Sequence, residues 1–268
     1  MRVDGMMAHD CSQYYLNRAR RFAGGAFRRL TSRKCAAYPM MKAFMADKVG
    51  LEIGGPSPIF RKNRLIPVYD CCQRIDGCNF ARRTIWGDAN DGAGFGPRFG
   101  RNYTAEACDL SAISSETYDF VLASHVLEHV ANPLRALLEW KRVLKVGGAL
   151  LVIVPDKRAS FDHRRPYTSF EHLESDLKSN ISEADLTHLE EVLRLHDLRL
   201  DPPAGSPERF RERCLNNYSV RGMHHHVFCP EVLALMFNRV SMRILSIESE
   251  HSFHIVGFAK RASDTSSN

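Results

Sequence analysis

The chain has 268 residues, of which 44 % are hydrophobic and 25 % charged, and its formal net charge at pH 7 is +6. This composition is ordinary for a soluble globular protein, and the length suits one large α/β domain, or one domain with an inserted cap. No apolar run approaches the roughly 20 residues of a membrane span, and the first ten residues, MRVDGMMAHD, lack the apolar stretch of a secretory signal.

Residues 1–47 predict a basic N-terminal segment of one or two helices, broken at Gly24 and Gly25. Its stretch from Asn17 to Lys34 carries seven Arg or Lys and no acid. A solvated helix face is the favoured interpretation, and weak contact with an anionic surface is the alternative. The acids Asp4 and Asp10 argue against an organelle transit peptide.

From Val49 onward, short apolar runs alternate with helical patterns. The runs are VGLEIGG, RLIPVYD ending at Asp70, YTAEACDL ending at Asp109, YDFVLASHV and ALLVIVP. Runs of this kind are typical of parallel strands that are buried on both faces. We therefore predict a Rossmann-like, doubly wound, mostly parallel seven-stranded sheet in an α/β domain whose core spans residues 48–155.

The clearest unit of this sheet lies between its last two runs. The segment LEHVANPLRALLEWKRVLKVGG has apolar residues at a helical period. Asn132 and Pro133 predict the start of the helix, and Gly147 and Gly148 predict its end. Strand, helix and strand then form a right-handed βαβ unit.

The cysteines give no metal signal. Cys71, Cys72 and Cys78 form the only cluster, and their spacing does not match a zinc site built from paired CxxC motifs. We expect reduced thiols in a cytoplasmic protein and no metal at these residues.

After Pro155 the strand pattern stops. Residues 156–226 are polar and rich in histidine and predict a helical lid, with one clear amphipathic helix, SEADLTHLEEVLRLHDLRL. Residues 227–262 return to the sheet with the helix PEVLALMFNRV and an antiparallel edge hairpin, and residues 263–268 predict a disordered tail.

The turn LEIGG ends the first predicted strand. Ligands of such sheets bind outside the carboxyl ends of the strands, and glycine lets the backbone approach a ligand closely. Asp70 follows Glu52 by eighteen residues, which is about the spacing of an acid that binds ribose hydroxyls in nucleotide-binding sheets. Asp76 is the alternative for that role, although PVYD makes the better strand end.

The motifs YDFVLASHVLEHVANP, RVLKVGGALLVIVP and HHHVFCPEVLALMF resemble class I S-adenosylmethionine-dependent methyltransferases of the small-molecule "type 11" kind. The resemblance covers roughly Val49 to Pro155 and implies S-adenosyl-L-methionine as cofactor. The cofactor-binding residues that it implies are Glu52, Gly54 and Gly55 for the methionine part, Asp70 for the ribose, Asp109 and Leu110 for the adenine, and Ser124 and His125 beside the cofactor. The chain departs from the family at Pro56 and Pro58, where the family continues with glycines.

The resemblance implies a methyltransferase that acts on a small-molecule or saccharide acceptor, with O-methylation as the expected reaction. No nucleic-acid-binding domain is recognisable in the sequence. One alternative is a non-catalytic protein that uses the cofactor-binding fold as a scaffold. The other is a nicotinamide-dependent oxidoreductase, which needs a G-x-G-x-x-G motif that this turn lacks.

The histidines of the insert allow three interpretations. His163, His224 and His226 are the candidate catalytic residues, because a neutral imidazole can take a proton from an acceptor hydroxyl. A second interpretation is a metal site formed by Asp162, His163 and two of the three adjacent histidines. The third is a hydrogen-bonded scaffold.

Adjacent side chains of a strand point to opposite faces, so His224 and His226 are expected to converge while His225 points away. Arg164 and Arg165 are candidates to bind an anionic substrate, and a salt bridge within the loop is the equal alternative.

Overall fold

The computed structural model describes residues 34–85, 87–88, 98–250 and 253–262. Most of the basic N-terminal segment and the predicted tail lie outside these residues. The helices are α3 (Tyr38–Met45), α4 (Pro133–Val143), α5 (Phe170–Lys178), α6 (Leu189–Leu195), α7 (Pro207–Leu215), α8 (Asn217–Val220) and α9 (Pro230–Arg239). Among the described residues, none of the helices has the length and apolar character needed to cross a membrane.

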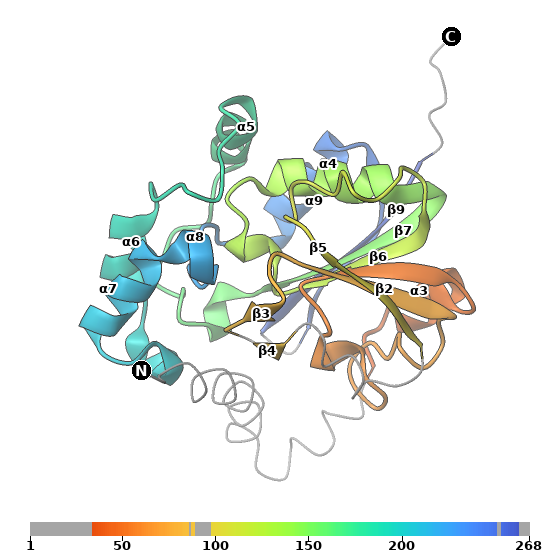
Figure 1. The fold of residues 1–268 in the computed structure, drawn as a ribbon, viewed down its shortest axis with the longest axis horizontal. Helices are drawn as coiled ribbons and strands as arrows, with labels where there is room; N and C mark the ends of the chain where they lie inside the picture. Colours follow the sequence, from red (N-terminus) through yellow and green to blue (C-terminus); the bar gives the residue numbers. More distant parts are fainter. Residues whose placement is uncertain (1–33, 86, 89–97, 251–252, 263–268) are drawn as a thin grey trace.

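One large sheet organises the molecule (Figure 1). Its strands are β1 (Val49–Ile53), β2 (Arg74–Asn79), β5 (Phe99–Thr104), β6 (Tyr118–Ser124), β7 (Leu144–Pro155), β8 (Met242–Glu250) and β9 (His254–Arg261), and β3 (Arg83–Thr84) and β4 (Gly87–Asp88) form a small hairpin. The strand order is β5-β2-β1-β6-β7-β9-β8, with β9 antiparallel to both of its neighbours. The predicted doubly wound, mostly parallel seven-stranded sheet is confirmed.

Helices cover both faces of this sheet. Helices α4 and α9 lie on one face, where Leu137, Trp140 and Phe237 are fully buried. Helix α3 lies on the other face and buries Met41 and Met45 against the strands. The parallel strands are therefore apolar along both faces, as their sequence indicated.

Helix α4 begins where the sequence predicts. The Asn132 side chain caps it by accepting the backbone N–H of Arg135, and Pro133 occupies the first turn. The helix ends at Val143, four residues before the predicted glycine stop, because β7 already begins at Leu144. A register shift separates this early pairing from the regular ladder that starts at Ala149.

Two predicted strands were placed incorrectly. The run RLIPVYD contains no strand; its residues Leu65, Ile66, Val68 and Tyr69 are buried against the core as a turn, and β2 follows at Arg74–Asn79. Pro67 was the signal against a strand, since proline cannot donate a ladder hydrogen bond. The third predicted strand also ends earlier, at Thr104.

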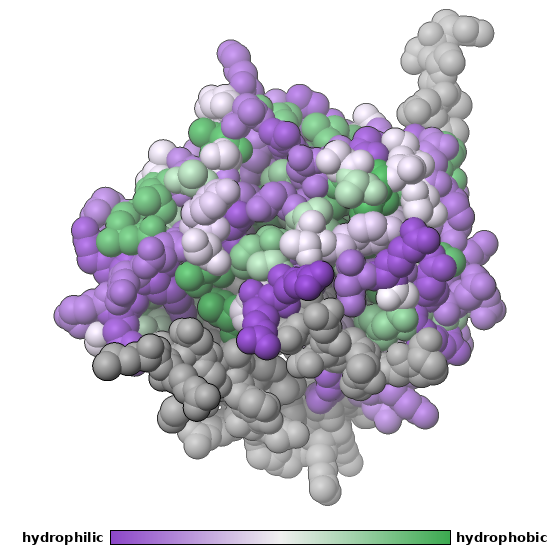
Figure 2. Space-filling model, viewed as in Figure 1, coloured by the Kyte–Doolittle hydropathy of each residue, from purple (hydrophilic) through white to green (hydrophobic). Residues whose placement is uncertain are grey.

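Helices α6, α7 and α8 of the insert lie at one end of the sheet (left in Figure 1), and its helix α5 lies at the top of that view, near α4. It has a small core of its own formed by Leu189, Val192, Ala204, Phe210, Cys214 and Met223. The predicted amphipathic helix is shorter than expected, at Leu189–Leu195, but its apolar face is buried in this core. In the view of Figure 2, hydrophilic side chains dominate the described surface and hydrophobic ones form small separate patches.

Candidate functional site

The turn after β1 has a shape that only glycine allows. Gly54 has a φ of 73°, in the left-handed region. A Cβ atom at Gly54 would lie 2.3 Å from the Cγ2 methyl of Val126, and one at Gly55 would lie 2.2 Å from the Glu52 carboxyl carbon. The turn therefore packs directly against the residues that follow β6.

Glu52 stabilises this turn through hydrogen bonds. Its Oε1 accepts the backbone N–H of Ser57 at 2.9 Å, and its Oε2 accepts the hydroxyl of Tyr69 at 2.7 Å. Burial raises the pKa of the Glu52 carboxyl to about 7, and the hydrogen bonds from Tyr69 and Ser57 act against that rise. Glu52 therefore fixes the conformation of the loop through its hydrogen bonds with Ser57 and Tyr69.

The next two strands end in polar residues that the sequence reasoning did not select. Asn79 is the last residue of β2, and its side-chain N–H₂ donates to the Gly55 carbonyl at 2.8 Å. Glu106 lies two residues beyond β5 and forms a two-point ion pair with Arg221 of the insert, at 2.9 and 3.0 Å. Correct placement of β2 and β5 would have identified both residues.

Asp70 does not end a strand. Its neighbour Cys71 accepts the backbone N–H of Asp47, just before β1 begins, so Asp70 lies at the opposite edge of the sheet from Gly54. The alternative, Asp76, lies inside β2, is buried, and accepts the Tyr118 hydroxyl at 2.8 Å. Neither acid reaches the carboxyl end of β2.

Asp109 and Leu110 also lie away from the end of their strand. Asp109 is five residues past β5, is exposed, and accepts the backbone N–H of Ser111 at 3.0 Å. The adjacent Leu110 is buried in the core. These positions follow from the early end of β5 at Thr104.

The tip of β6 carries a histidine in a strained conformation. Ser124 is the last strand residue, and His125 follows with a φ of 55°, which is uncommon for a residue with a side chain. One ring nitrogen of His125, Nδ1, lies 3.3 Å from Oε1 of Glu128, and the other, Nε2, lies 3.0 Å from Nδ1 of His254. Phe253 stacks on the ring with centroids 5.4 Å apart.

Glu128 is the acid of this arrangement, and it is fully buried. Within the described residues, neither of its carboxylate oxygens accepts a well-aligned hydrogen bond. Burial alone would raise the pKa of Glu128, but the nearby His125, His129 and His224 outweigh it and lower the pKa. A buried, ionised carboxylate therefore stands beside His125.

His224 lies in the same region, on the insert side. Its Nδ1 lies 2.5 Å from Oδ2 of Asp162, and its ring stands edge-on to His129 with centroids 4.5 Å apart. Burial lowers the pKa of His224, but the carboxylate of Asp162 outweighs it and raises the pKa overall. Burial lowers the pKa of His129 to about 3, so this ring is neutral.

The other predicted residues of the insert have separate partners. His163 is bonded to Asp197 at 3.1 Å, and Arg164 is bonded to the same carboxylate at 3.0 Å. Arg165 is fully buried and donates to Asp162, Glu191 and the carbonyls of His224 and His225. The structure thus favours salt bridges for both arginines, and Asp162 and His163 do not share the predicted metal site.

The triple histidine does not form a strand, so the expected alternation fails. His224 faces Asp162, His225 faces Asn217 at 3.0 Å, and His226 faces the Ala131 carbonyl at 3.2 Å. His224 and His226 therefore do not converge.

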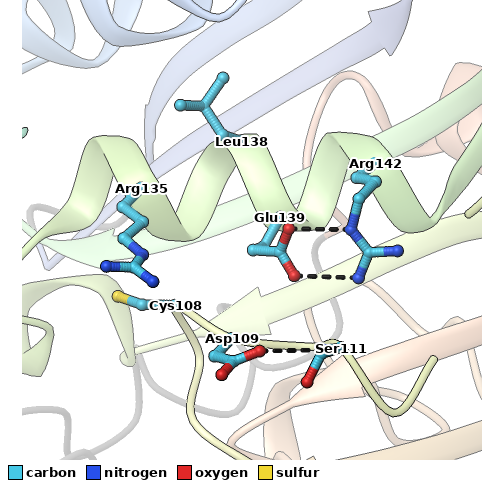
Figure 3. Close-up of a pocket in the computed structure, with 7 residues that line it drawn as sticks. All are labelled: Cys108, Asp109, Ser111, Arg135, Leu138, Glu139 and Arg142. Carbon is cyan, nitrogen blue, oxygen red and sulfur yellow. Dashed lines mark hydrogen bonds and ion pairs between the residues drawn. The ribbon is translucent and has the colours of Figure 1, made fainter. Parts of the chain in front are cut away.

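A hollow of about 550 Å³ lies along α4 and is open to solvent (Figure 3). It is lined by Cys108, Asp109, Ser111, Arg135, Leu138, Glu139 and Arg142. Glu139 and Arg142 form an ion pair in its wall, with their closest atoms 2.8 Å apart. The side chain of Leu138 points away from the other lining residues. Because none of the residues around the glycine turn lines it, this hollow is separate from the site at the strand ends.

The strand-end residues fit S-adenosylmethionine as a ligand. Gly54 and Gly55 let the turn pack against Val126 and Glu52, where a Cβ atom would collide, and they leave the backbone of the turn without side chains beside a ligand. Asn79 and Glu106 offer polar side chains at the ends of β2 and β5, suited to ribose hydroxyls and an adenine amine.

Residues 87–152 match the family model of a methyltransferase domain. No curated protein sequence matches the chain.

Solved structures share the fold. A S-adenosylmethionine-dependent methyltransferase from Mesorhizobium loti is 11% identical, with 85% of this chain and 98% of that chain covered and a TM-score of 0.50. The CurJ carbon methyltransferase is 15% identical, with 93% of this chain and 58% of that chain covered and the same TM-score of 0.50.

Proposed function

We propose that the chain is a class I, S-adenosylmethionine-dependent methyltransferase that methylates a hydroxyl group of a small-molecule or saccharide acceptor; the match of residues 87–152 to a methyltransferase domain supports this. The observation that carries the proposal is the pair of His125 and Glu128 at the tip of β6. Val126, the next residue after His125, contacts the glycine turn. A proton acceptor therefore stands beside the turn that would bind the cofactor.

The cofactor would be held by the turn at Gly54 and Gly55, by Asn79 and by Glu106. When bound, it supplies a methyl group on a sulfonium, which is already a good leaving group. The chain itself then has two tasks, to orient the acceptor and to take its proton.

His125 is the proposed base. Its Nδ1 faces the Glu128 carboxylate at 3.3 Å, so Nδ1 carries the ring proton and Nε2 has the lone pair. Nε2 accepts the proton of the hydroxyl group, and the ionised Glu128 stabilises the imidazolium that results. In this structure the lone pair faces Nδ1 of His254 at 3.0 Å, so the acceptor hydroxyl must take the place of this contact before Nε2 can receive its proton.

The insert is proposed as the cover of the acceptor. Arg221 links it to the strand ends by pairing with Glu106, and it also pairs with Glu183 within the insert at 3.0 Å. The backbone N–H of His225 also donates to the Glu128 carbonyl at 2.8 Å. These bonds hold the insert against the tip of β6, where it can exclude water from the base.

The test is turnover of S-adenosylmethionine with a panel of hydroxylated small molecules and saccharides. The variant His125→Asn keeps a residue that tolerates a left-handed backbone but removes the base. We expect its kcat to fall by about 10²–10⁴-fold, with unchanged affinity for S-adenosylhomocysteine by calorimetry.

The matched control is His163→Asn, at the histidine bonded to Asp197. It should keep the kcat of the wild type. Full turnover in His125→Asn, or a loss confined to His163→Asn, would reject His125 as the base and return that role to His163.

A further inference from the structure

Four side chains of the insert converge at a place that the methyl-transfer site does not use. They are His172, Asp176, His188 and His226, and we refer to them as the His172 cluster. The ring nitrogens that the three histidines offer all lie within 4.8 Å of one another.

The distances within the His172 cluster are short. Nε2 of His172 lies 3.0 Å from Nε2 of His188 and 3.2 Å from Oδ2 of Asp176. The same carboxylate oxygen lies 3.9 Å from Nε2 of His226. Four ligands bound tetrahedrally at about 2.0–2.1 Å from a zinc ion stand about 3.4 Å apart, so a small displacement would seat an ion among these atoms.

Three separate segments supply the ligands. His172 and Asp176 are four residues apart on α5, so their side chains share one face of that helix. His188 flanks the first turn of α6, and His226 is the last residue of the insert. These groups come together only when the insert folds, because no single helix carries all of them.

Hydrogen bonds within the described residues leave polar atoms of the His172 cluster without partners. Within the described residues, Oδ2 of Asp176 and Nδ1 of His226 are buried without a hydrogen-bond partner of acceptable geometry. Nε2 of His172 faces a second imidazole nitrogen and a carboxylate oxygen at once, but it can donate a single proton. A cation would use all of these lone pairs together.

We propose that the His172 cluster binds one divalent transition metal ion, with Zn²⁺ the best match, and that the ion fastens the insert to the core. Three imidazoles and one carboxylate suit zinc and leave no open position for a substrate. The fastening follows from His226, whose Nε2–H donates to the Ala131 carbonyl just before α4, which leaves the unpartnered Nδ1 as its ligand atom. The proposal is independent of the acceptor and of the base.

Two other groupings of potential ligands in the described residues serve less well. In the group of Glu128, His129 and His224, the last residue is already ion-paired with Asp162 at 2.5 Å. In the group of Cys35, Glu248 and Glu250, burial raises the pKa of the thiol to about 12 and keeps it protonated.

The test uses the full chain stripped of metal with a chelator and titrated with Zn²⁺, and with Co²⁺ as a spectroscopic probe. The wild type should bind one equivalent of Zn²⁺, show the intense visible absorption of tetrahedral Co²⁺, and unfold at a higher temperature with Zn²⁺ than without it. His172→Asn removes a half-exposed ligand and should weaken Zn²⁺ binding by about a hundredfold or more, since even indirect changes at metal sites cost about 10–100-fold.

Asp176→Asn should weaken binding in the same way, and the matched control His163→Asn should bind Zn²⁺ like the wild type. Absence of Zn²⁺ binding by the wild type would overturn the proposal. So would binding that survives both His172→Asn and Asp176→Asn, because the ion would then sit elsewhere. Methyl transfer can be measured separately, so failure of the metal site and failure of the proposed reaction are distinguishable.

Discussion

Replacing Glu52 by glutamine should change how the stability of the protein depends on pH. The carboxyl is fully buried, and its pKa is raised from 4.5 to about 7. At pH 4 it is protonated in both the folded and the unfolded chain and contributes nothing to the difference. As the pH rises, the unfolded chain ionises near 4.5 but the folded chain resists until about 7, so the free energy of unfolding falls across this window.

The size of the effect follows from the pKa. Each unit by which the pKa differs between the folded and unfolded chains corresponds to about 1.4 kcal/mol. Glu52 should therefore lower the free energy of unfolding by about 3 kcal/mol between pH 4.5 and pH 8. Glutamine keeps the oxygen that accepts from Ser57, and the Tyr69 hydroxyl can donate instead to the Ser57 carbonyl, 3.1 Å away. Glu52→Gln should therefore be the more stable protein at pH 8.

The assay is urea unfolding of both proteins at several pH values between 4.5 and 8. The difference between the two curves isolates Glu52, because the other groups titrate in both. Glu52→Ala is the control, since it loses the hydrogen bonds as well as the charge and should be destabilised at every pH. A difference between wild type and Glu52→Gln that stays constant over this range would refute the reasoning.

Three further predictions concern the turn, the insert and the strand ends. Gly54→Ala should weaken S-adenosylhomocysteine binding by about tenfold or more in calorimetry, because a left-handed backbone and a 2.3 Å contact both oppose a side chain. Arg165→Met should lower the free energy of unfolding by about 3–5 kcal/mol in urea, since Asp162 is left buried without its guanidinium partner; a loss under 1 kcal/mol would contradict this. Asn79→Ala should weaken S-adenosylhomocysteine binding by about 1–2 kcal/mol and Asp70→Ala should leave it unchanged; the reverse order would show that the acid does bind the ribose.

Local patterns were reliable where one physical cause dominated. The βαβ unit around α4 was predicted because Asn132, Pro133 and a buried helical stripe all indicate the same element. The closing helix and hairpin were predicted for the same reason. The failures at β2 and β5 came from apolar residues such as Ile66 that are buried without forming a strand, so burial alone mimicked a strand pattern.

The candidate site was harder to predict because it depends on contacts between distant segments. The sequence indicated the glycine turn and His125, but Glu128 was not among the candidate site residues that it suggested. Burial of Glu128 beside His125 depends on how the insert returns over β6, which no local pattern records. The same holds for His172 and His226, which lie more than fifty residues apart in the sequence and meet only in the folded insert.

The position of α3 determines how far the chain can be shortened. The family match begins only at residue 87, and the glycine turn begins near residue 52. A truncation just before Val49 would therefore remove neither of them. It would remove Met41 and Met45, which are fully enclosed against the strands, and uncover an apolar face of the sheet. The smallest piece able to fold by itself must therefore include α3, and a shorter one would be prone to aggregate through the bared face.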